Sequence, residues 1–188
     1  MVIDIGTGDG LYVYQSARRN PDHFYIGVDA NARPLEKIYR KPSKGGLPNA
    51  LFIQASLEDL PRDLEGIASE VRVQFPWGSL LRAVVTGDIG PLQRLRAVCA
   101  SGARLAVIIG LDLDRDRAEV QRLGLAPFSV EYIDSTLAAR YREGGFEVVE
   151  RGELQPSEWP SLNTSWARRL RGDGDRSVFY IFARAVRG

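Results

Sequence analysis

The segment Asp4–Gly10, which reads Asp-Ile-Gly-Thr-Gly-Asp-Gly, lies between an apolar run and a helical pattern. Glycine permits positive φ angles and lets the backbone approach a ligand closely. A dinucleotide fingerprint would require glycine where the chain has Leu11, and the two acids would repel a pyrophosphate. The loop therefore favours a ligand with an amino group and no phosphate. Its candidate binding residues are Asp4, Gly6, Thr7, Gly8, Asp9 and Gly10.

Two acids further along the chain stand where a nucleoside would need acceptors. Asp29 ends the second apolar run, where an acid accepts hydrogen bonds from a ribose diol. Glu58 follows the third run and can accept from an adenine amino group, with Ala30 and Leu57 as further candidate contacts. An amino-acid site, a ribose site and an adenine site in this order predict S-adenosylmethionine. The alternative is a glycine turn that only closes a strand against a helix.

The fourth apolar run ends in Phe75-Pro76-Trp77, a turn that carries no acid or amide side chain. In methyltransferases built on such a sheet, the end of the fourth strand faces the methyl group. An exocyclic amine or a hydroxyl often needs a proton removed before methylation, whereas a ring nitrogen with a free lone pair does not. The turn therefore favours a ring nitrogen as the methyl acceptor. The alternative for Trp77 is a buried core aromatic.

The elements that would position these residues alternate between strands and helices. Continuous apolar runs predict strands at 1–5, 24–28, 50–54, 71–75, 104–110, 146–150 and 177–185. Helical spacing predicts helices at 11–19, 30–40, 80–98 (broken near 87–91) and 133–142. This alternation indicates an α/β protein with a mostly parallel sheet covered on both faces. The segments 111–134 and 151–176 follow strand ends, where open α/β sheets bind ligands, so we expect substrate-binding loops there.

The composition fits one globular domain over residues 1–188, with 44% hydrophobic and 26% charged residues. A single cysteine excludes an internal disulfide, and one cysteine with one histidine predicts no metal site. No apolar run reaches about 18 residues, so no membrane span is predicted, and an acid near the N-terminus favours a cytoplasmic protein over a secreted one. The net charge is +1, but residues 166–188 hold six Arg against two Asp, which predicts a local basic patch.

Besides the glycine segment, three stretches carry a family resemblance: Lys-Pro-Ser-Lys-Gly-Gly-Leu-Pro-Asn at 41–49, Pro-Trp-Gly-Ser-Leu-Leu-Arg at 76–82, and Thr-Ser-Trp-Ala-Arg-Arg-Leu at 164–170. In this order, and over nearly the whole chain, they resemble the kanamycin–apramycin resistance family of 16S rRNA (adenine-1408-N1) methyltransferases. The glycine segment is shared by many methyltransferases. The second and third stretches together are specific to the family, and the last is the most diagnostic.

The resemblance implies a class I (Rossmann-like) S-adenosylmethionine-dependent methyltransferase fold. Its sheet has seven mostly parallel strands in the order 3-2-1-4-5-7-6, with the last strand antiparallel. The implied activity is N1 methylation of adenine 1408 of 16S rRNA within the 30S subunit. That modification would confer resistance to kanamycin- and apramycin-type aminoglycosides.

The same resemblance implies roles for individual residues. In the family the target adenine flips out of the RNA and stacks between two tryptophans, which correspond here to Trp77 and Trp166. A backbone carbonyl at the turn, here that of Pro76, accepts from the adenine amino group. The loop around Trp166 would be placed over the cofactor by Thr164 and Ser165. The expected RNA contacts are Lys41, Lys44, Arg168, Arg169 and Arg176.

Two features depart from the family pattern. Family members carry an extension before the glycine motif, whereas this chain begins three residues before Asp4, and the loop 172–175 is acidic where the family is basic. We therefore expect weaker affinity for rRNA and unchanged cofactor binding. Two other interpretations stay open: a tRNA or small-molecule methyltransferase on the same scaffold, or a protein that binds cofactor and RNA without turnover. We expect a monomer.

Overall fold

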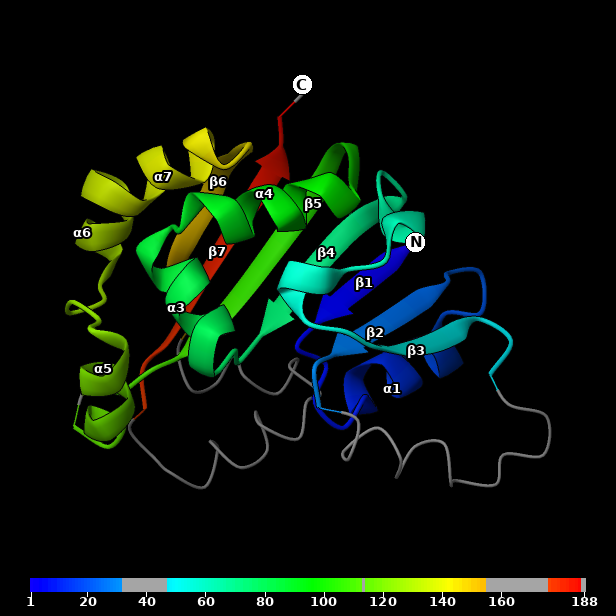
Figure 1. The fold of residues 1–188 in the computed structure, drawn as a ribbon, viewed down its shortest axis with the longest axis horizontal. Coiled ribbons are helices and arrows are strands. Elements are labelled where there is room, and N and C mark those ends of the chain that lie inside the picture. Colours follow the sequence, from blue (N-terminus) through cyan, green and yellow to red (C-terminus); the bar gives the residue numbers. More distant parts are fainter. Residues whose placement is uncertain (32–46, 113, 155–175, 187–188) are drawn as a thin grey trace.

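The computed structural model describes residues 1–31, 47–112, 114–154 and 176–186. The strands of this part form one seven-stranded sheet with the order β3-β2-β1-β4-β5-β7-β6 (Figure 1). β3, β2, β1, β4 and β5 pair in parallel in this order, while β7 is antiparallel to both β5 and β6. The predicted strand order and the antiparallel last strand are thereby confirmed.

The elements follow the predicted alternation closely. The strands are β1 (Val2–Ile5), β2 (Tyr25–Asp29), β3 (Ala50–Gln54), β4 (Ala68–Gln74), β5 (Cys99–Gly110), β6 (Phe146–Leu154) and β7 (Val178–Ala185). The α-helices are α1 (Leu11–Arg19), α3 (Gly78–Thr86), α4 (Ile89–Val98), α5 (Arg117–Leu123), α6 (Val130–Tyr132) and α7 (Ala138–Glu143). Short 3₁₀ turns lie at Leu57–Asp59 and Arg62–Leu64, and a π-helical turn, Ile133–Leu137, joins α6 to α7.

The sheet buries side chains on both faces, because successive side chains of each strand point to opposite faces. Ile3 and Ile5 of β1 belong to the larger cluster, which also holds residues of α3, α4 and α7. Val2 of the same strand faces the other way and packs with Val13 and Ala17 of α1. In Figure 1, α3, α4 and α7 lie together over one face of the sheet. Among the described residues, no helix is long and apolar enough to cross a membrane.

Three strands are longer than predicted, and one predicted helix cannot be compared. β4 begins at Ala68 rather than 71, β5 begins at Cys99 rather than 104, and β6 continues to Leu154 rather than ending at 150. β6 gains these residues because β7 continues the antiparallel ladder as far as the pair Leu154 and Val178. The helical stretch 80–98 is divided as expected, since α3 ends before Gly87, whose φ is 66°. The helix expected at 30–40 lies almost entirely outside the described residues.

A buried hydroxyl joins two helices of the larger cluster. Tyr141 of α7 is fully buried and donates a hydrogen bond to the carbonyl of Val84 at 3.0 Å. Val84 lies in the last turn of α3, where carbonyls lack a donor within the helix. The tyrosine therefore satisfies a helix end and fixes α3, whose first turn begins directly after Trp77.

We expect Tyr141→Phe to lower the free energy of unfolding by about 1–2 kcal/mol, because a buried carbonyl loses its donor while the ring still packs. Urea denaturation followed by circular dichroism measures this loss, with an unchanged m-value. Tyr132→Phe is the matched control, because the structure gives the Tyr132 hydroxyl no hydrogen-bond partner among the described residues. Equal losses in the two variants would contradict the proposed role of the hydrogen bond.

Candidate active site

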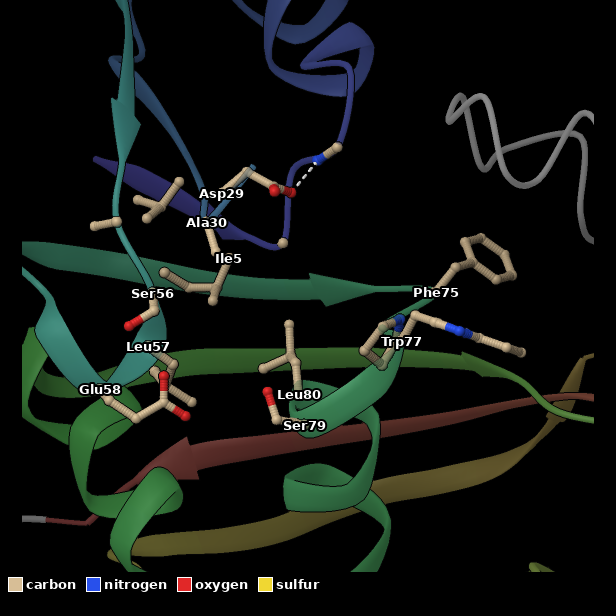
Figure 2. Close-up of a pocket in the computed structure, with 15 residues that line it drawn as sticks. Ile5, Asp29, Ala30, Ser56, Leu57, Glu58, Phe75, Trp77, Ser79 and Leu80 are labelled. Carbon is tan, nitrogen blue, oxygen red and sulfur yellow. Dashed lines mark hydrogen bonds between the residues drawn. The ribbon is translucent and has the colours of Figure 1, made fainter. Parts of the chain in front are cut away.

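A pocket of about 260 Å³ opens where β1, β2, β3 and β4 end (Figure 2). Asp29 and Ala30 lie on one side of it, Glu58 on a second and Trp77 on a third, with Leu80 between them in this view. The lining residues are Ile5, Gly6, Gly8, Val28, Asp29, Ala30, Ala55, Ser56, Leu57, Glu58, Phe75, Pro76, Trp77, Ser79 and Leu80. Four separate parts of the sequence thus meet at one edge of the sheet, as expected for a parallel α/β fold.

The glycine loop is held in shape by the carboxylate of Asp29. One carboxylate oxygen accepts from the backbone N of Gly8 and the other from that of Asn31, both at 2.8 Å. Gly6 has a φ of 75°, and a Cβ built there would lie 2.8 Å from Cδ2 of Leu80. Glycine at position 6 therefore permits both the turn and the close approach of α3. Each oxygen of Asp29 still has lone-pair capacity toward the pocket.

A second carboxylate, that of Asp4, lies buried beneath the same loop. It accepts from Oγ1 of Thr7 at 2.7 Å and from Nε2 of Gln74 at 3.2 Å. Burial raises the pKa of Asp4 from 3.8 to about 6, although the hydrogen bonds from Thr7 and Gln74 oppose this rise. The side chain thus joins β1 to β4 below the pocket.

The turn after β4 places an aromatic ring at the mouth of the pocket. Phe75 has a φ of 49°, in the left-handed region that non-glycine residues rarely adopt, and Gly78 has a φ of 61°. The Phe75 backbone N donates to the carbonyl of Ile108 at 2.8 Å, which holds the strained residue in place. Between these residues, Trp77 is 46% exposed and lines the pocket. The alternative of a buried core aromatic is therefore wrong for Trp77.

Comparisons with known proteins identify one family over nearly the whole chain. The family model NpmA, described as 16S rRNA (adenine(1408)-N(1))-methyltransferase, matches residues 1–185. The chain belongs to this family. A 16S rRNA (adenine(1408)-N(1))-methyltransferase from Streptoalloteichus tenebrarius is 40% identical over 181 residues, which cover 94% of this chain and 82% of the relative.

Solved structures of similar proteins share the fold. The aminoglycoside resistance methyltransferase NpmB1 superposes with a TM-score of 0.84 at 43% identity, over 98% of this chain and 86% of the other. A tryptophan-to-alanine variant of the enzyme from Catenulisporales acidiphilia, solved with its cosubstrate SAM, gives 0.87 at 34% identity, over 99% and 85% of the two chains. The class I methyltransferase fold expected from the sequence is confirmed.

Eight of the site residues predicted from the sequence line the pocket. These are Gly6, Gly8, Asp29, Ala30, Leu57, Glu58, Pro76 and Trp77. Four other residues predicted for the cofactor lie outside the lining: Asp4, Thr7, Asp9 and Gly10. Asp9 accepts from the backbone N of Leu11 at 3.2 Å at the start of α1. These four residues shape the loop, and their contact with the cofactor stays a prediction.

Seven predicted residues lie outside the described part of the chain, and Arg176 lies in a buried ion pair. The seven are Lys41, Lys44, Thr164, Ser165, Trp166, Arg168 and Arg169. Arg176, expected to bind RNA, is 9% exposed and forms an ion pair with Asp116. Its Nη1 also donates to the carbonyl of Gly110 at 3.3 Å. A contact between Arg176 and RNA would therefore require this buried pair to open.

Several residues at the site carry no local signal in the sequence. Ser79 and Leu80 line the pocket because α3 starts directly after the turn, which a helix predicted from position 80 does not reveal. Gln74 could be recognised only once the pairing of β1 with β4 is known. Among the described residues, no group of three or more His, Cys, Asp or Glu side chains could hold a metal ion.

We expect Asp4 to make stability depend on pH. Its pKa is raised on folding, so the folded state binds the proton more tightly, and stability rises as pH falls from about 6 to about 4. The stability of the wild type relative to Asp4→Asn should therefore increase by about 2–3 kcal/mol between pH 7 and pH 4. Urea denaturation at several pH values measures this difference. A constant difference across the range would show that Asp4 does not titrate in this window.

Proposed function

We propose that this chain methylates N1 of adenine 1408 of 16S rRNA, with S-adenosylmethionine as the methyl donor. It acts as a cytoplasmic monomer on the 30S subunit, without a metal ion, and confers resistance to aminoglycosides. Membership of the 16S rRNA (adenine(1408)-N(1))-methyltransferase family supports this proposal. The observation that carries it is the position of Trp77, a half-exposed indole beside a pocket with a glycine loop and two carboxylates.

The residues of the pocket fit S-adenosylmethionine by their chemistry. Asp29 provides a carboxylate for a ribose diol, and its position is fixed by the backbone N of Gly8. Leu57 and Leu80 offer apolar contacts to an adenine, and Glu58 offers an acceptor for its amino group. A Cβ at Gly8 would meet no atom within 4 Å, so the loop leaves open space at this point. When bound, the cofactor supplies a methyl group attached to a positively charged sulfur.

The turn after β4 provides the position for the flipped base. We propose that the adenine stacks on Trp77, with Trp166 on its other face, and that the carbonyl of Pro76 accepts from its amino group. Stacking on an aromatic side chain contributes ~1–3 kcal/mol per base, against a cost of a few kcal/mol to unstack the base. The methylated adenine is a cation, which two indole faces stabilise through their electron-rich surfaces.

No side-chain base is needed at this turn. Adenine N1 carries a free lone pair and no proton, so the transfer depends on the orientation of the base. Among the described lining residues, the carboxylates are those of Asp29 and Glu58. Asp29 ends β2 and Glu58 follows β3, so neither belongs to the turn after β4, which is consistent with roles in binding the cofactor.

Docking on the ribosome would depend on basic residues outside the described part of the chain. We propose that Arg169 contacts an RNA phosphate, with Arg168, Lys41 and Lys44 as further contacts. With a net charge of +1, the chain has little charge for sequence-independent binding, so it must recognise a folded RNA surface. We also propose that residues 1–188 act as one domain in which 111–134 and 151–176 form the substrate-binding segments.

Primer extension on 16S rRNA from cells that express the chain tests this function. N1 lies on the pairing edge of adenine, so its methylation should stop reverse transcriptase one nucleotide before position 1408. We expect Trp77→Ala to remove the stop and Trp77→Phe to keep part of it, because a smaller ring still stacks. Cells should grow on kanamycin and apramycin only when they express a variant that produces the stop. A wild-type protein that gives no stop, while labelled methyl groups enter tRNA instead, would reject the proposal.

We expect Asp29→Ala to weaken S-adenosylmethionine binding by about tenfold to a hundredfold, since a charged acceptor of the ribose is lost. Isothermal titration calorimetry on the free protein measures the affinity. Asp59→Ala is the control, because Asp59 is an exposed acid next to Glu58 that does not line the pocket. Equal affinities for Asp29→Ala and the wild type would place the ribose elsewhere.

A further inference from the structure

A second buried carboxylate, that of Glu119, contacts the turn that carries Trp77. Glu119 of α5 is 9% exposed, and its Oε1 accepts a hydrogen bond from the backbone N of Gly78 at 3.2 Å. Arg122 donates to both of its oxygens, from Nε to Oε2 and from Nη2 to Oε1, each at 2.7 Å. The carboxylate thus connects the segment 111–134 to the residue that follows Trp77.

The hydrogen bond from Gly78 meets a need of α3. The first backbone N–H groups of a helix lack acceptors within the helix, and Trp77, at the N-cap position, supplies none from its side chain. A negative charge is also favoured near a helix N-terminus. The hydrogen bonds from Arg122 hold the pKa of Glu119 below its usual value, so the carboxylate is charged at neutral pH. Glu119 therefore caps α3 from a different element of the fold.

The helix that carries Glu119 is itself anchored at its start. Asp116 precedes α5 and forms a buried ion pair with Arg176, two residues before β7. Both members of this pair also bond to the backbone around the end of β5. Arg176 donates to the carbonyl of Gly110, and Asp116 accepts from the backbone N of Asp112. α5 is consequently fixed to the sheet at one end and to the Trp77 turn by Glu119.

We propose that Glu119 is a positioning residue for methyl transfer, which by holding the amide of Gly78 fixes the direction of the Trp77 ring and the Pro76 carbonyl. It is not among the residues that line the pocket. Its effect on the reaction therefore passes through the turn. This inference rests on the proposed function, because the direction of Trp77 matters only where a base stacks on it.

Three variants test the positioning role on intact 30S subunits at saturating cofactor. We expect Glu119→Ala to lower kcat by about tenfold to a hundredfold, the effect of losing one hydrogen bond to a charged acceptor. Glu119→Gln should recover most of the rate, because its amide oxygen can still accept from Gly78. Glu143→Ala is the matched control: it removes a glutamate that also pairs with an arginine three residues away, but that is exposed and lies in α7, outside the proposed substrate-binding segments. The affinity for S-adenosylmethionine should be unchanged in all three.

Hydrogen exchange of the free protein gives a readout independent of activity. The peptide containing Gly78 should exchange faster in Glu119→Ala than in the wild type, Glu119→Gln or Glu143→Ala. A wild-type kcat in Glu119→Ala would overturn the positioning role. So would equal losses of kcat, cofactor affinity and melting temperature without recovery in Glu119→Gln, since that pattern describes a general loss of structure. If the wild type itself leaves 30S subunits unmethylated, the proposed function fails first, and the positioning role fails with it.

Discussion

The buried carboxylate of Asp4 ties the glycine loop to the fourth strand, and both halves of the pocket depend on that connection. Thr7 donates to it from the loop and Gln74 from the end of β4. Because Gln74 directly precedes Phe75, the loop expected to hold the cofactor and the turn expected to hold the base share one anchor. Burying a carboxylate is costly unless hydrogen bonds compensate, which accounts for the two donors that face Asp4.

The exposed position of Trp77 is the second constraint on the site. The hydrophobic effect favours burial of an indole. A rigid backbone is therefore needed to keep the Trp77 side chain at the surface. The turn is held on both sides of Pro76 and Trp77: Phe75 donates to Ile108 of β5, and Gly78 donates to Glu119 of α5. Left-handed conformations at Phe75 and Gly78 then set the direction of the chain. Both hydrogen bonds involve partners far away in the sequence.

This difference in sequence distance explains what could be predicted from the chain alone. The glycine loop follows β1, Asp29 ends β2 and Glu58 lies in the turn after β3, so local patterns were sufficient to locate them. The face to which Asp4 points depends on strand alternation and on pairing with β4, which local patterns do not reveal. The ion pair of Arg176 with Asp116 joins residues 60 positions apart, so local patterns could not reveal it, and the RNA contact of Arg176 stays a prediction. Glu119 and Gly78, 41 residues apart, became neighbours only when α5 packed beside α3.

The glycine loop and the turn after β4 lie on different sides of the pocket, and this arrangement has a consequence for the chemistry. Methyl transfer from a charged sulfur to a neutral ring nitrogen moves a positive charge from the cofactor to the base, and no proton leaves adenine N1. The pocket therefore needs groups that hold each partner while the charge moves, namely carboxylates near the cofactor and an indole face near the base. Asp29 and Glu58 lie on the side of the pocket proposed for the cofactor, and Trp77 lies on the side proposed for the base. With Glu119 supporting only the turn, as proposed, the affinity for the cofactor and the rate of transfer would be controlled by different residues.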